Sequence, residues 1–493
     1  MSSLNRNIWL PWIAGIAVAL LAAYPFFHDL GKFPVFQWDE ARYANNSVEI
    51  VQNGHWLDFR MDGEIDRWNF KPPLVLWLQA ASMKVFGCTE FGVRLPSALA
   101  GVAIALMLFG FCSQVLKSLQ AGIVSVLFFL ASPGFIGPHM GRTADLDAVQ
   151  TFFVTLYSLY FIRYLLENRP PNRTFASLAL MVLAAFLCKG MPGLLLLPYL
   201  AIIALLPHNY RKVLPYKSLY LYGAMALLAC AAYYVLREWQ TPGYWALVKK
   251  SEFNRFSGEG LAWHKHDAWF YLRNFTELKR YPLIYWVPLT LPAFFLLRPG
   301  QLRRFFGYCW LIAAGYLAFI SWPPVKLEWY DAPLYPFFAL IFGLAVSESA
   351  GWAARKLGWR TDWIAALGIT LLLCWQSYGL VAEKIDYQPA KMADFEREGV
   401  FINQMLREHP DWLDYAVLKK VKHPEHLDQV KFYQKSLLQR FGVQIAVYTD
   451  FKEAAAGQRV LVSQPEQADS LLLRFPATQT LYATEYGRLL LLK

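Results

Sequence analysis

Long blocks of apolar residues dominate the sequence up to about residue 382. A helix that crosses the hydrocarbon core of a bilayer needs about 20 residues of this kind. The pattern therefore predicts an all-α polytopic membrane domain over residues 1–382, with about eleven transmembrane helices. The predicted helices cover residues 8–27, 93–116, 119–138, 146–166, 174–188, 190–206, 218–236, 281–297, 305–322, 332–348 and 363–382.

Two polar segments between these blocks, residues 28–92 and 237–280, are too long to be simple connectors. Loops of this length are usually functional. The first segment is expected to hold two short helices. One covers residues 40–52 with Asp39 as its N-cap. The other, over residues 73–86, is strongly apolar and suits the plane of the membrane surface.

Beyond residue 383 the hydropathy falls and the pattern changes to alternating strands and helices. Residues 442–448, 459–462 and 488–492 have the composition of strands. Residues 383–493 are therefore expected to form a small α/β domain. This segment carries no motif for chemistry, so its expected role is structural or the recognition of an acceptor.

The Lys and Arg residues indicate the orientation, because cytoplasmic loops of membrane proteins carry the positive excess. With the N-terminus inside, the cytoplasmic segments hold fourteen cations but only three acids, Glu167, Glu348 and Asp362. The two long loops and the α/β domain then lie outside the cytoplasm. This topology accounts for most of the formal charge of +11, and no basic patch on a soluble domain indicates a nucleic-acid partner. The cations are Arg6, Lys117, Arg163, Arg169, Arg173, Arg211, Lys212, Lys217, Arg298, Arg303, Arg304, Arg355, Lys356 and Arg360.

Six ionisable residues fall on the outer connections. Two of them, Lys189 and Lys326, lie at membrane depth, where a charge costs about 2.5–3.5 kcal/mol by insertion scales and is a functional candidate by default. Five of the six also have a structural explanation: Asp39 or Asp147 as a helix cap, Lys71 as a headgroup anchor, Arg255 as a stacking partner of its aromatic neighbours, and Lys326 as the partner of Glu328. Their shared side of the membrane favours one site. The six are Asp39, Lys71, Asp147, Lys189, Arg255 and Lys326.

Glycosyl transfer from a lipid phosphate is the chemistry that fits this set. The departing phosphate is a good leaving group that needs cations, and one carboxylate must accept the proton of the acceptor. A glycosidase would need a paired acid and base instead. Asp39 at a helix N-terminus, where the helix dipole keeps it ionised, is the expected base. The His264-x-His266 spacing in the second loop is a weak metal signal, because both rings share a face only on a strand.

Three motifs between residues 38 and 97 carry a family resemblance: Trp38-Asp39-Glu40-Ala41-Arg42-Tyr43-Ala44, Lys71-Pro72-Pro73-Leu74 and Arg94-Leu95-Pro96-Ser97. They resemble the bacterial branch of the protein mannosyltransferase superfamily, which has the GT-C fold. Within that branch the chain is most similar to the lipid A 4-amino-4-deoxy-arabinose transferases. The resemblance runs from about residue 30 to about residue 340.

The resemblance implies roles for the candidate residues. It implies that Asp39 is the base and that Asp147 is a second catalytic carboxylate in the same cavity. The expected cations around the carrier phosphate are Arg42, Lys71, Lys189 and Arg255, to which Lys326 is added from its position, and the expected further cavity residues are Glu40, Tyr43, Tyr330 and His266.

Two departures from the family pattern concern a divalent metal ion. Relatives commonly have Glu directly before the Lys-Pro-Pro motif, where this chain has Phe70. The aminoarabinose transferases often have His three residues before the loop arginine, where this chain has Glu252. A metal cofactor is therefore expected only if Glu252 or His266 supplies a ligand.

The sequence thus predicts an inverting glycosyltransferase that takes its sugar from a polyprenyl-phosphate carrier at the outer face of a bacterial inner membrane. The expected acceptor is lipid A, another lipid-linked glycan or a protein. The alternative is a carrier that flips lipid-linked sugars without chemistry. Such a carrier would place its ionisable groups near the bilayer midplane and would often show an inverted repeat, and the sequence shows neither.

Overall fold

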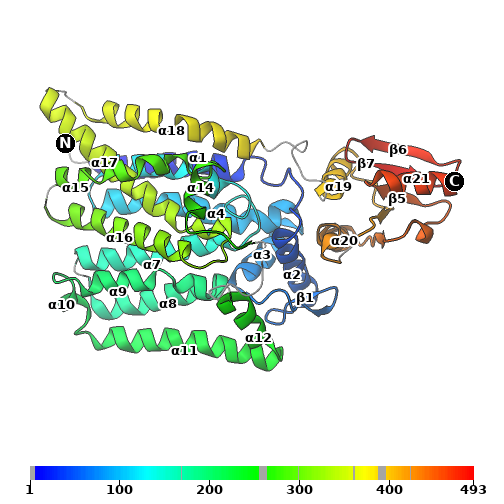
Figure 1. The fold of residues 1–493 in the computed structure, drawn as a ribbon, viewed down its shortest axis with the longest axis horizontal. Helices are drawn as coiled ribbons and strands as arrows, with labels where there is room; N and C mark the ends of the chain where they lie inside the picture. Colours follow the sequence, from blue (N-terminus) through cyan, green and yellow to red (C-terminus); the bar gives the residue numbers. More distant parts are fainter. Residues whose placement is uncertain are drawn as a thin grey trace.

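The computed structural model describes residues 6–167, 169–254, 264–297, 299–358, 361–386, 396–421 and 424–493. Within these ranges, eight helical segments are long and apolar enough to cross a membrane. They form the bundle at the left of Figure 1. They are α1 (Arg6–Phe27), α4 (Glu90–Gly110) with its extension η1 (Phe111–Val115), α7 (Asp147–Glu167), α8 (Pro171–Lys189), α11 (Lys217–Gln240), α16 (Gln301–Ser321), α17 (Leu334–Leu357) and α18 (Trp363–Ile385).

The remaining three predicted membrane helices are shorter or broken. The block at 119–138 gives α5 (Leu119–Leu130) and α6 (Pro133–Ile136), and 190–206 gives η2 (Met191–Leu194) and α9 (Leu197–Leu205). The block at 281–297 forms only η5 (Pro282–Trp286), η6 (Pro288–Thr290) and α15 (Ala293–Leu296). Prolines at 282, 288 and 292 explain this result, because proline removes a helical hydrogen bond and clashes with the preceding turn. The membrane fold is confirmed, but the count of eleven long helices is not.

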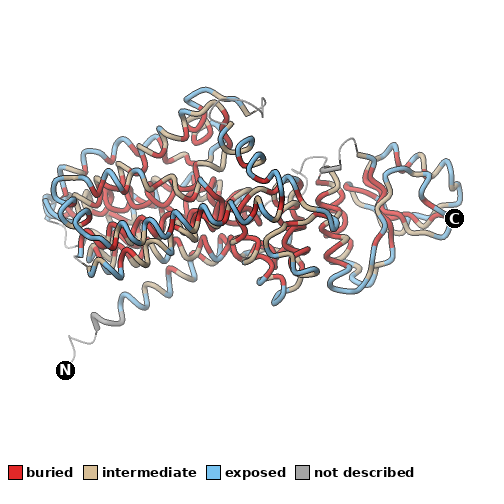
Figure 2. Tube along the Cα trace, turned by 90° about the horizontal axis from the view of Figure 1, so that it is seen from below, coloured by how far each residue is buried: buried red, intermediate tan, exposed pale blue. Residues whose placement is uncertain are grey.

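Burial separates the central helices from the peripheral ones. In α17, 78% of the apolar span is buried, whereas in α11 the figure is 11%. The exposed side chains of α11 and α18 include Leu227, Leu228 and Leu372, all more than 60% exposed. Figure 2 shows the buried stretches in the interior of the bundle and exposed ones along its outside. Apolar surface of this extent fits contact with lipid.

The segment between α1 and α4 contains α2 (Asp39–Asn53), the hairpin of β1 (Arg60–Met61) and β2 (Glu64–Ile65), and α3 (Leu74–Phe86). Both helices predicted here are present, and α2 ends at Gly54, whose φ of 71° lies in the left-handed region. The predicted N-cap is wrong. The cap position is held by Trp38 with a φ of 73°, and Asp39 is the first residue of α2 and makes no capping hydrogen bond.

A five-stranded sheet with helices forms the C-terminal domain. Its strand order is β4-β3-β5-β7-β6, in which β3 pairs in parallel with β4 and β5, and β7 pairs antiparallel with β5 and β6. The strands predicted at 459–462 and 488–492 correspond to β5 and β7. The elements are α19 (Arg397–Glu408), β3 (Ala416–Leu418), η10 (Pro424–Leu427), α20 (Asp428–Phe441), β4 (Ala446–Tyr448), η11 (Phe451–Glu453), β5 (Arg459–Val462), α21 (Pro465–Arg474), β6 (Gln479–Thr484) and β7 (Gly487–Leu491).

The C-terminal domain packs on α2 through α19 and α20, which Figure 1 shows between the sheet and the bundle. Ala44 and Val48 of α2 share one buried apolar cluster with Phe401 of α19 and Phe432 of α20. The N-terminus and α10 (Tyr210–Val213) lie at the opposite end of the bundle. The remaining short helices are α12 (Tyr244–Val248), η3 (Lys249–Phe253), α14 (Phe270–Thr276) and η7 (Glu328–Asp331).

Candidate functional site

A cavity at the end of the bundle nearest α2 collects residues from several connections between the membrane helices. Five residues that the sequence analysis named line it: Lys71, Asp147, Lys189, Glu252 and Tyr330. The rest of its lining is mostly apolar and aromatic. It includes Met191, Leu195, Tyr316, Phe319, Ile320 and Trp329. A pocket with apolar walls and a few convergent charges is the usual form of a small-molecule or cofactor site.

Lys189 and Asp147 form a buried ion pair in this cavity. Lys189 is the last residue of α8 and Asp147 the first residue of α7, so two helix ends bring them together. Gly190 then turns the chain with a φ of 80°, which favours glycine, and a Cβ there would lie 3.4 Å from the Glu252 carboxylate. The ammonium of Lys189 also lies 5.3 Å from the centre of the Tyr330 ring.

Lys71 and Glu252 form a second ion pair, with 2.8 Å between Nζ and Oε1. Both side chains are about nine-tenths buried. The other oxygen of Glu252 is buried without a hydrogen-bond partner in the part of the chain described. Glu252, which the sequence offered as a metal ligand, therefore serves as the counter-ion of a predicted phosphate-binding lysine.

Asp39 is partly buried and does not line this cavity, but the charges of Lys189 and Asp147, which do, act on its carboxyl group. It makes no hydrogen bond or ion pair with any described residue. Burial and the negative charge of Asp145 raise the pKa of Asp39 to about 6, against the opposing charges of His139 and Lys189. A carboxylate that titrates near neutral pH and has no partner is suited to accept a proton.

His139 and Asp145 lie next to Asp39, and sequence reasoning did not single out either as a site residue. His139 has a φ of 61° and stacks on Trp329 with 3.9 Å between ring centres. Its Nδ1 lies 3.2 Å from Oδ1 of Asp145, and the Thr143 hydroxyl donates to Oδ2 of Asp145 at 2.6 Å. Burial lowers the pKa of His139, but the adjacent Asp145 outweighs that effect and raises it to about 9.

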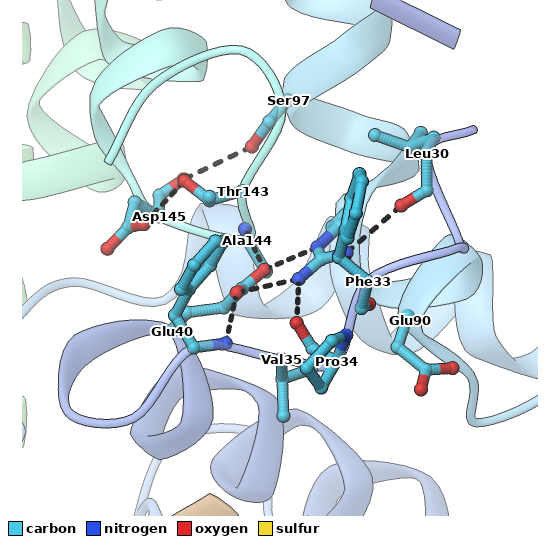
Figure 3. Close-up of polar contacts among 12 residues, drawn as sticks. Leu30, Phe33, Pro34, Val35, Glu40, Glu90, Ser97, Thr143, Ala144 and Asp145 are labelled. Atoms are coloured by element: carbon cyan, nitrogen blue, oxygen red, sulfur yellow. Dashed lines mark hydrogen bonds and ion pairs between the residues drawn. The ribbon is translucent and has the colours of Figure 1, made fainter. Parts of the chain in front are cut away.

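Glu40 holds the loops of the site together and does not line the cavity. Its carboxylate accepts two hydrogen bonds from the Arg94 guanidinium, at 2.7 and 2.9 Å, and one from the backbone of Ala144 at 2.8 Å. Arg94 also donates to three backbone carbonyls in the segment before α2, those of Leu30, Phe33 and Pro34. Figure 3 shows this cluster beside Thr143 and Asp145. A fully satisfied buried pair of this kind fixes Asp39 relative to the 138–147 loop.

Two of the cations predicted to bind the phosphate make their contacts outside the cavity. Arg42 donates to both oxygens of Asp66, at 2.8 and 3.2 Å, and to Asp428 of the C-terminal domain at 3.2 Å. Lys326 donates to the carbonyls of His266 and Pro323. Neither residue lines the cavity, so the structure assigns both to the joining of loops.

The remaining candidates also lie apart from the cavity lining. His266 stacks on Phe270 with 4.0 Å between ring centres, and Tyr43 lies 5.5 Å from the Trp68 ring. Arg255 lies outside the described residues. Among the described residues, one group of side chains lies close enough together to hold a metal ion, and it consists of Asp39, His139 and Asp145. Neither Glu252 nor His266 belongs to it.

The fold and the site define a polytopic membrane protein in which one end of the helix bundle holds an apolar cavity with paired lysines and carboxylates. Residues 70–235 match the family model described as dolichyl-phosphate-mannose-protein mannosyltransferase. The resemblance inferred from the motifs is thereby confirmed.

Curated relatives and solved structures point the same way. The undecaprenyl phosphate-alpha-4-amino-4-deoxy-L-arabinose arabinosyl transferase of Pseudomonas paraeruginosa is 30% identical over 72% of this chain. The protein of the same name with the suffix 2, from Proteus mirabilis, is 26% identical over 76% of this chain. The alignments span 63% and 67% of those two proteins, respectively. The crystal structure of ArnT from Cupriavidus metallidurans bound to undecaprenyl phosphate has the same fold, with a TM-score of 0.65 and 15% identity over 99% of this chain and 98% of that one.

Proposed function

We propose that this protein is an inverting glycosyltransferase that moves a sugar from a polyprenyl phosphate to an acceptor at the outer face of a bacterial inner membrane. The observation that carries the proposal is the cavity itself. Two lysines, Lys71 and Lys189, face a space with apolar walls, and the charge of Lys189 acts on an unpartnered carboxylate, that of Asp39. The donor in the names of the arabinosyl transferases, an undecaprenyl phosphate sugar, supports this assignment. The resemblance of the motifs to the lipid A transferases favours lipid A as the acceptor.

In the proposed reaction, the acceptor hydroxyl attacks the anomeric carbon of the sugar. The bond from that carbon to the phosphate oxygen breaks, its electron pair leaves with the polyprenyl phosphate, and the hydroxyl proton passes to Asp39. The phosphate gains one negative charge as it leaves, from a diester to a monoester. Lys71 and Lys189 therefore stabilise the transition state more than the bound donor, which is the condition for catalysis. One displacement inverts the anomeric centre.

The proposal is tested with purified protein reconstituted in proteoliposomes with a polyprenyl-phosphate sugar. Asp39→Asn keeps the shape of the side chain, and since Asp39 makes no capping hydrogen bond the fold should survive. We expect normal donor binding with turnover reduced about 10²–10⁴-fold, the usual effect of removing a general base. Asp147→Asn, which leaves the base in place but removes the partner of Lys189, should lose less. Near-normal turnover by the Asp39 variant would refute its role as base.

A further inference from the structure

The side chains of Asp39, His139 and Asp145 converge from α2 and the 138–147 loop. One oxygen or nitrogen atom of each lies within 4.8 Å of those of the other two. His139 Nδ1 and Asp145 Oδ1 are 3.2 Å apart. Two atoms bound to one ion at about 2.0–2.2 Å with angles of about 90–110° are separated by about 2.8–3.6 Å. The histidine and one aspartate hydrogen-bond to each other at a distance that two ligands of one metal ion would also have, and a bound ion would displace the proton between them.

The third group is free to complete the set. Asp39 makes no hydrogen bond or ion pair with any described residue, and its carboxylate lies within 4.8 Å of the ligand atoms of the other two groups. The other two groups are held in place. His139 is fixed by its stacking on Trp329, and the Thr143 hydroxyl orients Asp145 through the oxygen that faces away from His139. Supporting hydrogen bonds of this kind are typical of metal ligands.

Charge also favours a cation at this position. Asp39, Asp145 and Asp147 crowd together, and only Lys189 and His139 balance them among the neighbours that act on Asp39. A bound divalent ion would compensate for this charge in a partly buried site.

We propose that Asp39, His139 and Asp145 form a binding site for a divalent transition-metal ion. Two carboxylate oxygens and one imidazole nitrogen suit Zn²⁺ or Mn²⁺, whereas Ca²⁺ prefers oxygen ligands alone and Mg²⁺ an octahedral shell rich in water. Three protein ligands leave a position open for water or a substrate oxygen. The site stands apart from Glu252 and His266, the ligands that the sequence offered.

The test measures metal binding to the full-length protein in nanodiscs, without donor or acceptor, so that its outcome is independent of the transferase activity. The protein is stripped with a chelator and titrated with Zn²⁺ and with Mn²⁺, and the bound metal is counted by mass spectrometry. We expect one ion per chain. Asp145→Asn and His139→Ala should each weaken metal binding more than tenfold. Thr143→Val leaves all three ligands in place and should weaken metal binding about tenfold. Glu252→Gln and His266→Gln are the matched controls and should bind as the unaltered protein does.

Thermal unfolding provides a second readout for variants that are less stable. A ligand that binds only the folded state raises Tm, so Zn²⁺ should raise the Tm of the unaltered protein and of the two controls but not that of Asp145→Asn. Absence of stoichiometric Zn²⁺ or Mn²⁺ in the unaltered protein would overturn the proposal. Equal binding by Asp145→Asn and the controls, or loss of binding in Glu252→Gln, would overturn it as well.

Discussion

The segment that begins α2 is held from both sides by the C-terminal domain. The backbone N–H of Gln37 donates to Glu396 at 2.8 Å, and the Trp38 ring meets that of His426 edge to face at 5.1 Å. One turn further on, Arg42 binds Asp428. Asp39 lies between these contacts. We therefore expect the C-terminal domain to fix the position of the candidate base, although it contributes no residue to the lining of the cavity.

The perturbation that isolates this effect is Asp428→Asn. The change keeps the size of a buried side chain and leaves the Asp428 backbone carbonyl bonded to Asn45, but it removes the charge that faces Arg42. A hydrogen bond to a charged group contributes about 1.5–3 kcal/mol and a neutral one about 0.5–1.5 kcal/mol. The expected loss is therefore about 1–2 kcal/mol, or about a 5- to 30-fold rise in the open population of the interface.

Hydrogen exchange of the amides in α2 and α20 measures that population directly. Burial raises the pKa of Asp428 to about 6 even with Arg42 beside it, so the desolvation of the charge offsets part of the loss and the stated factor is an upper limit. The comparison is made at about pH 8, where the carboxylate is charged. Exchange in both helices should accelerate by up to that factor, and turnover should fall while donor binding persists. The exposed Asp411→Asn on the same domain is the control. Unchanged exchange in Asp428→Asn would refute the argument that this contact holds α2.

Three further outcomes are expected. Burial, with a smaller contribution from Glu40, raises the pKa of Glu396 to about 7 against the hydrogen bonds of Gln37 and Gln429 and the charge of Lys419. Because the folded pKa exceeds the unfolded value of 4.5, its stabilising contribution is complete below about pH 4.5 and is lost as the pH rises through about 7, at most about 3 kcal/mol. The Tm should depend less on pH across that range in Glu396→Gln than in the unaltered protein. An identical dependence of Tm on pH in the two proteins would contradict the assignment. Lys189→Ala should weaken both donor binding and turnover, since the phosphate is charged before and after it leaves, and a variant normal in both would leave Lys189 as a turn residue only. Cysteines placed at positions 62 and 450 should react with an impermeant reagent from outside the cell, and labelling at 212 or 303 instead would reverse the topology.

The cavity residues could be predicted where the sequence fixes their place at a helix end. Asp147 starts a membrane helix and Lys189 ends one, so the apolar blocks alone put both at the same membrane boundary. Lys326 is also predicted at this boundary, but its ammonium donates to the carbonyl groups of His266 and Pro323. Such a contact depends on the approach of two loops, which no periodic pattern records.

Other features depend on contacts far apart in the chain. Arg42 meets Asp428 across 386 positions, and a sequence gives no reason to pair them. His139 is a single histidine in a turn, and only its stacking on Trp329 and its bond to Asp145 distinguish it. The hydropathy of residues 281–297 is high enough to predict a membrane helix, but the prolines in this block break the helical hydrogen bonds. The fold class thus followed from composition, whereas the assignment of roles within the site required the tertiary contacts.

The two lysines of the cavity have one further consequence, for the choice of ligand. Each is already neutralised, Lys71 by Glu252 and Lys189 by Asp147. An incoming phosphate therefore enters by ion exchange: it must replace a carboxylate, because a buried lysine left without a partner would cost about 3–5 kcal/mol. The phosphate of a lipid carrier is held at the membrane beside the cavity and meets it at a high effective concentration, whereas a small phosphate anion arrives from water at its bulk concentration. We therefore expect the two ion pairs to favour an amphiphile over free phosphate.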